Sequence, residues 1–433
     1  MASDLDGDLG VDVLIIGGGI QGLYLARALH KQYSVCILSD PHAPSETLDS
    51  PGYFSAGYNG NDVARIQPAR RAAGYWRLWA ESNGVPHHEV PPYYVMSNDE
   101  EGTRTRLWSD ATLKSSVAPD VPPIFGRGSL VGQAAYLAEN DVVMNPTDVV
   151  AKLREGLEDH IIQGEVRKFG IITDKAVDFV EVETMDGRAV PITPRFLLLA
   201  ANVGNGALLQ KLVATFKDRG KRKEAVDTMR GCQAVRRRTT VVARGDLPLV
   251  AGHFDGLDIV AHYVGTGTYV WLISPPIDDG QTVLGPEEVR FSPKLDHDVV
   301  SRTVDQLFQV APLLKDKAGS LEWGAYVARK TEHPMMATPD TSKIAQPAPA
   351  RLETLDMEGF IAAWPSHLSY AMIVGDVVAE KVQNALGPAG DFTDGPQLSD
   401  FASVPEEQVA RWEKSSFEWH RWPDFQTLMG IHD

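Results

Sequence analysis

The sequence predicts an α/β fold, α+β overall, and two observations along the chain support this class. Near the N-terminus, the apolar run 13–16 is typical of a strand buried on both faces, and it leads into a glycine-rich turn, a helical pattern and a second buried strand at 35–38. Beyond residue 160, β-rich runs alternate with helical patterns. The chain has 433 residues, so two domains or one large two-part domain are expected.

The glycine-rich turn carries the spacing G-x-G-x-x-G, formed by Gly17, Gly19 and Gly22. Gly17 permits the tight turn, Gly19 lets a pyrophosphate approach the backbone, and Gly22 lets the helix pack closely on the strand. The N–H groups and the positive dipole end at the start of the helix favour phosphates. Because the motif follows a predicted strand and opens a predicted helix, it indicates a Rossmann-type dinucleotide site rather than an accidental glycine turn.

The position that should bind the ribose hydroxyls is less clear. Such folds usually place an acidic residue directly after the second strand, but here that position is Ser39, and Asp40 follows it. Asp40 can reach the ribose instead, or Ser39 can make a weaker hydrogen bond. The alternative for Asp40 is a solvated loop carboxylate before Pro41.

Charge and composition exclude several classes of function. Hydrophobic residues make up 43% and charged residues 23% of the chain, which is ordinary for a globular protein. The formal net charge of -17 argues against nucleic-acid or anionic-membrane partners, which need basic surfaces. The basic run 217–223 is expected to be a solvated loop, and the arginines at 236–238 either border an acidic substrate or begin a solvated strand.

The two cysteines, Cys36 and Cys232, are too few for a disulfide framework or for a multi-cysteine zinc or iron–sulfur site, and no metal site is expected. No apolar run reaches the length of a membrane span, and the acidic start of the chain lacks a signal-peptide pattern. The sequence therefore predicts no membrane span and a cytoplasmic location.

The remaining elements follow from hydrophobic period and helix-start signals. Further strands are expected at 93–96, 161–169, 179–185, 196–200, 238–243, 257–264, 269–273 and 360–363. Helices are expected at 63–79, from an N-cap at Thr147 to about 157, at 296–308 and at 371–386.

Two regions lack a clear element pattern. Residues 84–140 are expected to alternate short strands with Pro-rich loops. The tail after Gly387 contains Trp412, Trp419 and Trp422, and its run 403–406 (Ser-Val-Pro-Glu) indicates a capping box at the start of a final helix.

This order of features resembles the FAD-dependent amine and amino-acid oxidoreductases, the D-amino-acid oxidase/sarcosine oxidase (glycine oxidase-like) superfamily. The segments that carry the resemblance are the glycine motif, Arg65 after a Gly/Asn-rich loop, 143–150, 165–167, 196–202, 230–232, 333–340 and the strand-turn-helix at 360–375. The chain departs from the family pattern at Ser39 and at 364–369, where Trp-Pro-Ser-His-Leu-Ser replaces the usual glycine-rich turn.

The resemblance implies a Rossmann-type FAD-binding domain formed by 11–83, 141–228 and 350–388. A β-rich substrate domain of 84–140 and 229–349 is interleaved with it, and a C-terminal helical tail of 389–433 follows. The residues implied in FAD binding are Gly17, Gly19, Ile20, Gln21, Gly22, Ser39, Asp40, Arg65, Val166, Ala200, Ala201, Ser366, His367, Leu368 and Ser369.

The implied reaction is oxidation of a C–N bond in a small amine or amino-acid-like molecule, with hydride transfer to flavin N5 and reoxidation by molecular oxygen. Arg65 and Arg329 would anchor a substrate carboxylate, because arginine binds carboxylates through two hydrogen bonds. Lys330 or His367 would tune the flavin. The alternatives are a surface pair for Arg329 and Lys330 and a hydrogen-bonded structural role for His367.

Two other classes of function stay open. The unusual turn at 364–369 also suits a flavin-dependent tailoring oxidase or monooxygenase of a larger biosynthetic substrate. The Trp-containing tail also suits a flavin-binding regulatory or interaction protein that associates with itself or with a partner through this tail. Disulfide reductases are disfavoured because no cysteine pair lies near the first helix. Aromatic hydroxylases are disfavoured because Gly375-Asp376 falls inside a predicted helix.

Overall fold

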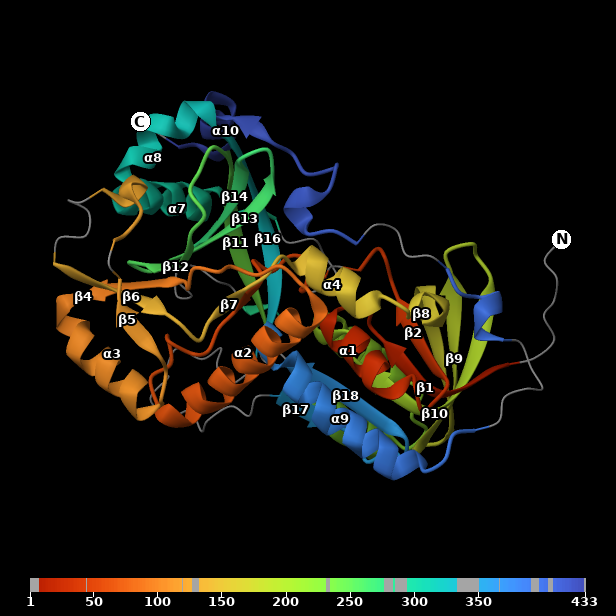
Figure 1. The fold of residues 1–433 in the computed structure, drawn as a ribbon. Coiled ribbons are helices and arrows are strands. Elements are labelled where there is room, and N and C mark those ends of the chain that lie inside the picture. The colour runs from red at the N-terminus through yellow and green to blue at the C-terminus, as the bar shows by residue number, and fades with distance from the viewer. Residues whose placement is uncertain are drawn as a thin grey trace.

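A seven-stranded sheet forms one side of the molecule (Figure 1). The computed structural model describes residues 8–43, 45–118, 120–126, 132–230, 234–275, 283–284, 294–332, 350–365, 367–390, 397–403 and 408–431. The strand order is β1-β2-β8-β9-β10-β18-β17, and β1 also pairs with β10. The strands are β1 (Leu9–Ile16), β2 (Val35–Ser39), β8 (Ile161–Thr173), β9 (Ala176–Thr184), β10 (Ala189–Leu199), β17 (Ala350–Glu353) and β18 (Phe360–Pro365).

The central strands of this sheet are parallel and buried on both faces. β8, β2, β1, β10 and β18 run parallel to one another, so the loops that follow them gather at one edge. Side chains alternate between two core clusters, with Val13 and Ile15 on one face and Leu14 and Ile16 on the other. This confirms the reading of 13–16 as a strand buried on both faces.

Helices cover both faces of the sheet. Those that pack on the side of Val13 and Ile15 are α1 (Ile20–Leu29), α2 (Val63–Asn83), α4 (Pro146–Arg154) and α9 (Ala371–Leu386). On the opposite face lie α5 (Asn205–Val213) and α6 (Arg219–Arg230). Cys36 belongs to the core on this second face and is fully buried, as its place in an apolar strand predicts.

A ten-stranded sheet forms the other side of the molecule, in the order β19-β16-β11-β14-β13-β12-β4-β6-β5 with β15 beside β11. Its strands are β4 (Tyr93–Ser97), β5 (Ser115–Val117), β6 (Gln133–Ala138), β11 (Ala234–Gly245), β12 (Ala251–Phe254), β13 (Leu257–Gly265), β14 (Thr268–Ser274), β15 (Val283–Leu284), β16 (Glu322–Glu332) and β19 (His420–Arg421). Two short strands, β3 (Tyr53–Phe54) and β7 (Val142–Val143), pair separately.

Helices α7 (His297–Val310), α8 (Pro312–Lys317) and α10 (Trp422–Met429) lie together at the top of Figure 1 and pack on one face of the ten-stranded sheet. Helix α3 (Asn98–Asp110) packs against β4 and β6. The short 3-10 helices are η1 (Pro123–Phe125), η2 (Glu158–His160), η3 (Asn202–Gly204), η5 (Ala318–Ser320), η8 (Leu368–Tyr370), η9 (Leu398–Asp400) and η10 (Arg411–Glu413).

Two helices lie where the sequence predicts loops or strands. α3 buries one side chain, Trp108, so it has little apolar periodicity, and three acidic residues in its first turn stabilise its N-terminus. α6 covers most of the basic run 217–223, and the Asp218 carboxylate accepts a hydrogen bond from the Lys221 N–H at 2.9 Å. Polar interactions at the start of both helices therefore contribute to their stability, and hydrophobic period does not reveal them.

Two predicted helix starts are also corrected or left open. The N-cap of α4 is Asn145, whose side chain accepts from the Thr147 N–H, rather than Thr147 itself. The final helix begins at Trp422, while most of the run 403–406 lies outside the described residues. In its described residues the tail holds a short α-helix, α10, and a strand, β19, that joins the ten-stranded sheet.

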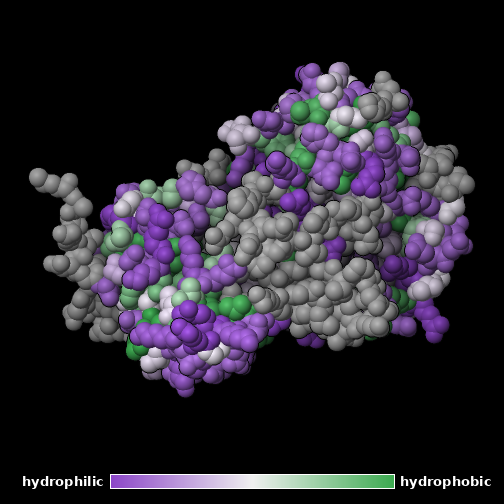
Figure 2. Space-filling view, turned by 180° about the vertical axis from the view of Figure 1, so that it is seen from behind, coloured by the Kyte–Doolittle hydropathy of each residue, from purple (hydrophilic) through white to green (hydrophobic). Residues whose placement is uncertain are grey.

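The surface seen from behind is mostly hydrophilic where it belongs to described residues, with small separated hydrophobic patches (Figure 2). Within the described part of the chain, no helix has the length and apolar character needed to cross a membrane. The described residues also contain no cluster of three or more His, Cys, Asp or Glu side chains suited to hold a metal ion.

Candidate functional site

A cavity of about 2310 Å³ lies between the carboxyl edge of the seven-stranded sheet and one face of the ten-stranded sheet. The loops after β1, β2, β10 and β18 form one wall, and β11, β13 and β16 form the other. Residues of the tail also line this cavity, including Arg411, Lys414 and Phe417. The predicted dinucleotide turn and a second set of polar side chains thus face the same space.

The three motif glycines play different parts in this wall. Gly17 has φ of +129°, and a Cβ there would stand 2.6 Å from the Ala200 carbonyl carbon. A Cβ on Gly22 would stand 1.8 Å from the Gly17 oxygen, so Gly22 serves helix packing and does not line the cavity. At Gly19 the nearest atom to a Cβ is the Thr47 hydroxyl oxygen at 3.2 Å, and the position lines the cavity.

The N-terminus of α1 fits the pyrophosphate of a dinucleotide. Its first turn carries no acidic residue, and the Ile20 N–H donates to the Thr47 hydroxyl at 3.2 Å. Gln21 lines the cavity, and both atoms of its side-chain amide are buried without a hydrogen-bond partner among the described residues. A buried amide without partners costs about 1–3 kcal/mol, which a bound polar ligand would offset.

The ribose candidates Ser39 and Asp40 both line the cavity, Ser39 buried and Asp40 half-buried. One oxygen of the Asp40 carboxylate accepts from the His42 N–H at 2.9 Å. Val166, Ala200 and Ala201 line the same wall. Which of Ser39 and Asp40 binds ribose stays a prediction.

The turn after β18 also faces the cavity, through His367, Leu368 and Ser369. The Ser369 carbonyl accepts from the Trp76 indole N–H at 2.9 Å, so α2 holds this turn in place. Ser366 lies outside the described residues. Arg65 falls in the first turn of α2, and its side chain also lies outside the described part.

The His367 side chain lines the cavity and is exposed to it. Desolvation by the protein around the cavity, together with the charges of Lys330 and Arg238, lowers its pKa to about 3, so the imidazole is neutral at neutral pH. Among described residues the ring makes no hydrogen bond and lies 5.8 Å from the Tyr370 ring. The alternative of a hydrogen-bonded structural histidine is therefore not supported by the described contacts.

Lys330 and Arg329 lie on β16, and neighbouring strand residues point to opposite faces. On one face, Lys330 lies opposite Arg236 of β11 in the strand register, and Arg238 is two residues further along β11. Arg238 pairs with the Asp258 carboxylate at 2.8 Å, and His253 contacts the same carboxylate at 3.2 Å. Burial tends to raise the pKa of Asp258, but these two neighbours bring it below its usual range.

Arg329 belongs to the other face of β16. It is 7% exposed, so the alternative of a surface residue is wrong for it. Burial lowers the pKa of its guanidinium, while the charges of Asp49 and Glu46 act in the opposite direction. The structure thus brings Lys330 and His367 together and sets Arg329 beside the loop at 45–50.

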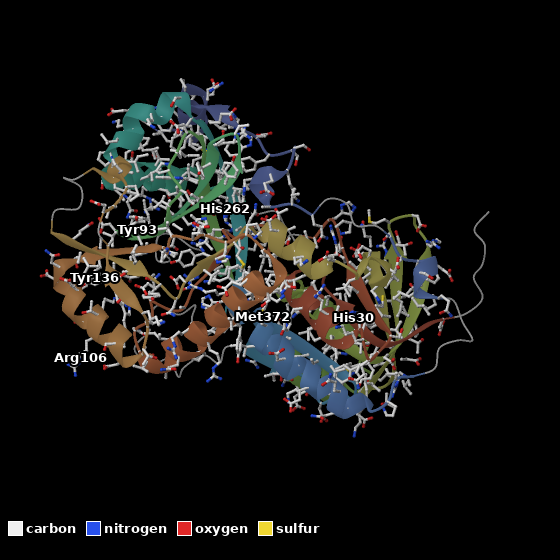
Figure 3. All side chains as sticks on the ribbon, viewed as in Figure 1. His30, Tyr93, Arg106, Tyr136, His262 and Met372 are labelled. Atoms are coloured by element: carbon white, nitrogen blue, oxygen red, sulfur yellow. The ribbon has the colours of Figure 1, made fainter. Side chains whose placement is uncertain are left out.

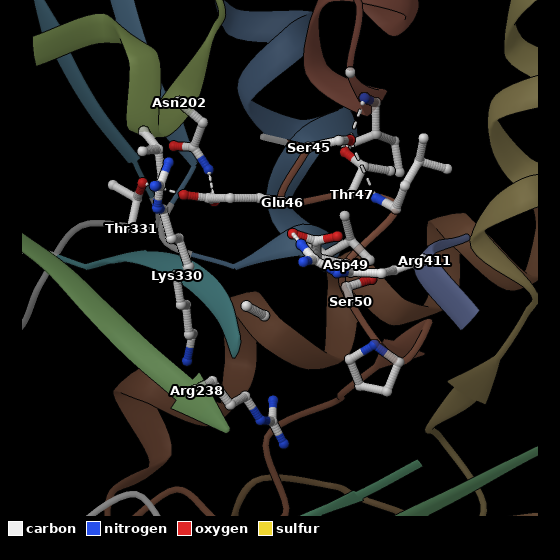
Figure 4. Close-up of a pocket in the computed structure, with 18 of the residues that line it drawn as sticks. Ser45, Glu46, Thr47, Asp49, Ser50, Asn202, Arg238, Lys330, Thr331 and Arg411 are labelled. Carbon is white, nitrogen blue, oxygen red and sulfur yellow. Dashed lines mark hydrogen bonds and ion pairs between the residues drawn. The ribbon is translucent and has the colours of Figure 1, made fainter. Parts of the chain in front are cut away.

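That loop supplies functional candidates that the sequence reasoning missed, namely Glu46, Thr47 and Asp49 (Figure 4). The Glu46 carboxylate accepts from the Thr331 hydroxyl at 2.5 Å and from the Asn202 amide. Burial raises the pKa of Glu46 to about 8, although Thr331 and Lys330 oppose this. Burial also raises the pKa of Asp49, against the opposing charges of Arg411, Lys414 and Arg329.

A buried asparagine, also missed, fixes the ends of two strands. The Asn205 side chain accepts from the Ala201 N–H at 2.9 Å and donates to the Ala363 carbonyl at 2.9 Å. It thereby holds the loop after β10 against β18. A sequence signal existed, because an amide directly after an apolar strand and a glycine turn is a common backbone-binding choice.

Comparison with known proteins agrees with this geometry. A family model described as FAD dependent oxidoreductase (DAO) matches residues 12–380. A probable FAD-dependent oxidoreductase from Pseudomonas aeruginosa is 22% identical over 422 residues, which cover 92% of this chain and 95% of that protein.

Solved structures share the fold. The crystal structure of the FAD-dependent oxidoreductase from P. aeruginosa has a TM-score of 0.66 at 20% identity and covers 94% of this chain and 99% of its own. Glycine oxidase from Geobacillus kaustophilus has a TM-score of 0.62 at 14% identity, and the match covers 92% of this chain and 99% of the oxidase. L-Proline dehydrogenase from P. horikoshii has a TM-score of 0.61 at 16% identity, and the match covers 91% of this chain and 98% of the dehydrogenase.

Substitutions at Gly19 and Gly22 are expected to have different effects, the first on FAD binding and the second on stability. Gly19→Asp should fold, because its backbone is extended and its Cβ meets one atom, the Thr47 hydroxyl oxygen, but its carboxylate should repel the pyrophosphate. Like charges this close cost several kcal/mol, so the Kd for FAD should rise more than about 100-fold. Gly22→Ala should instead lower the melting temperature of the apoprotein. Wild-type FAD affinity in Gly19→Asp would overturn the assignment.

The raised pKa of Glu46 predicts that the stability of the apoprotein depends on pH. Because its folded-state pKa is raised to about 8, the folded protein keeps a proton that the unfolded chain releases near the ordinary Glu pKa. Its contribution to stability is therefore present below about pH 4.5 and is lost as the pH rises to 8.

Urea unfolding from pH 5 to pH 8 tests this expectation. Wild type should lose stability relative to Glu46→Gln, at no more than about 1.4 kcal/mol per pH unit. Glu158→Gln, at an exposed carboxylate, is the control. A difference between wild type and Glu46→Gln that stays constant with pH would contradict the proposed burial.

Proposed function

The chain belongs to the DAO family of FAD-dependent oxidoreductases, and from this premise we propose that it oxidises a C–N bond of a small, anionic amine or amino-acid-like substrate. The part of the chain around the seven-stranded sheet would bind FAD, and the part around the ten-stranded sheet would bind the substrate. This follows the division into 11–83, 141–228 and 350–388 against 84–140 and 229–349.

The observation that carries the proposal is the cationic sheet face opposite the glycine turn. Lys330, Arg236 and Arg238 line the cavity from adjacent strands, although the chain as a whole has a net charge of -17. A concentration of positive charge inside an acidic protein favours an anionic ligand group such as a carboxylate. Lys330 and Arg238 would bind that group.

Desolvation and positive charge at this wall of the cavity also support oxidation of an amine. Bound FAD supplies two-electron oxidation of the substrate carbon. The environment that lowers the pKa of His367 to about 3 would also lower the pKa of a substrate ammonium held beside Lys330 and Arg238. The substrate nitrogen would then keep its lone pair at neutral pH, and the neutral His367 would not compete for the anionic group.

We also propose Arg65 and Arg329 as substrate anchors, Arg329 at a second position in the cavity. Arg329 lies on the side of β16 that faces Asp49 and Glu46, away from Lys330. We further propose molecular oxygen as the acceptor of the electrons. The structural relatives named glycine oxidase and L-proline dehydrogenase carry amino acids in their names, which supports the substrate class.

A second candidate is the oxidation of a larger biosynthetic substrate. The cavity of about 2310 Å³ exceeds the range of about 300–1,000 Å³ for most ligand pockets, and FAD would take up part of it. Its wall reaches Tyr94 and Arg104, beyond the charged sheet face. Room of this kind suits a substrate that extends past its carboxylate.

Anaerobic bleaching of the flavin absorbance, with amines, amino acids and hydroxy acids compared, tests the reaction. Amino acids or other carboxylated amines should bleach the flavin, and oxygen should restore its colour with consumption measured at an electrode. Bleaching only by NAD(P)H, stimulated by an aromatic compound, would refute the proposal and favour a monooxygenase.

Lys330→Met tests the proposed anion contact. Loss of one charged hydrogen bond should raise KM for a carboxylated substrate about tenfold or more, with FAD content unchanged. The corresponding amine without a carboxylate should be affected less. Lys315→Met, an exposed lysine of α8, controls for loss of charge. Equal effects on both substrates would contradict a carboxylate contact.

A further inference from the structure

We infer that the C-terminal segment 408–414 acts as a clamp on the cofactor site, by fixing the loop that closes over the N-terminus of α1. The inference concerns retention of FAD and does not depend on which substrate is oxidised. It gives the tail a role inside the chain that neither the family match nor the relatives assign, since the match ends at residue 380.

The loop at 45–51 is the target of the clamp. Its Thr47 hydroxyl accepts from the Ile20 N–H at 3.2 Å and stands 3.2 Å from the position of a Cβ on Gly19. The loop therefore borders the place where a pyrophosphate would meet α1. Glu46 and Asp49 of the same loop line the cavity.

Three backbone carbonyls in the second half of this loop are held from outside the loop. The Leu48 carbonyl accepts from the Arg411 N–H at 3.0 Å. The Asp49 carbonyl accepts from the Tyr326 hydroxyl at 3.1 Å, and the Pro51 carbonyl contacts the His262 ring at 2.8 Å. The tail and the ten-stranded sheet therefore both form hydrogen bonds with the backbone at 48–51.

Side chains of the tail also contact this loop and the ten-stranded sheet. The Arg411 guanidinium lies 3.5 Å from the Asp49 carboxylate and over the Tyr326 ring, at 5.5 Å from its centre. Trp412 is buried and stacks on His262, with ring centres 5.5 Å apart and planes 10° from parallel. His262 itself lies near the middle of the molecule (Figure 3), so the tail reaches well inside it.

The tail is anchored in turn to the start of α4. The Glu413 carboxylate accepts from the Asn145 amide at 2.6 Å and from the Thr147 hydroxyl at 2.5 Å. The Thr147 hydroxyl also accepts from the Ala410 N–H at 2.8 Å. Residues 410–413 therefore connect α4, the loop at 45–51 and the ten-stranded sheet, which are the parts that must stay together around a dinucleotide.

Arg411 and Glu413 are positioning residues in this account, since they act on FAD through the loop. In the full-length chain, Arg411→Met and Glu413→Gln should each raise the Kd for FAD about tenfold, measured by flavin fluorescence on rebinding to apoprotein. They should also reduce the rise in melting temperature that FAD gives. Thr147→Val should have the same effect from the α4 side, so the test survives if one variant folds poorly.

The matched control is Asp424→Asn, which makes the same acid-to-amide change at an exposed position in α10. A purely structural role would lower the melting temperatures of apoprotein and holoprotein equally and leave the Kd unchanged, which would overturn the clamp. A change of mass on size exclusion at unchanged Kd would also overturn it, and would favour self-association through the tail. Point variants are needed because truncation would remove Phe425, which is fully buried in the core.

Discussion

The structure depends on the close approach of the glycine turn to the end of β10. Gly17 sits so near Ala200 that no side chain fits between them, and Gly22 meets Gly17 in the same way. This packing sets the start of α1 at the edge where the parallel strands end. The loops after β2, β10 and β18 then face the same cavity because their strands share that direction. A cofactor site at this edge follows from backbone geometry before any side chain is considered.

The other wall of the cavity owes its chemistry to the two-residue period of β16. One face of this strand presents Lys330 toward Arg238, Asp258 and His367, while the other places Arg329 and Thr331 near Glu46 and Asp49. The first group is cationic and suits an anionic substrate. The second is an acid–base network around a loop of the cofactor site. Arg329 and Lys330, which are adjacent and carry the same charge, therefore contact different groups.

The sequence was sufficient wherever the physics is local or periodic. The run 13–16, the glycine spacing and the strand-turn-helix at 360–386 could be predicted because burial on both faces and backbone freedom leave clear patterns. Glu46 and Asp49 could not, since an acidic loop residue looks solvated until a distant strand covers it. The helix α3 was missed because a single buried side chain, Trp108, gives no period. The aromatic tail was visible, but its contacts with Asp49 and His262 depend on residues far apart in the chain.

The proposed chemistry requires a dinucleotide lying along the glycine turn between the two walls. The most direct measurement is the absorbance spectrum of the purified full-length protein, followed by release and quantification of the bound nucleotide. We expect a yellow protein that holds one FAD per chain. A colourless protein that gains no flavin absorbance when incubated with FAD would contradict it.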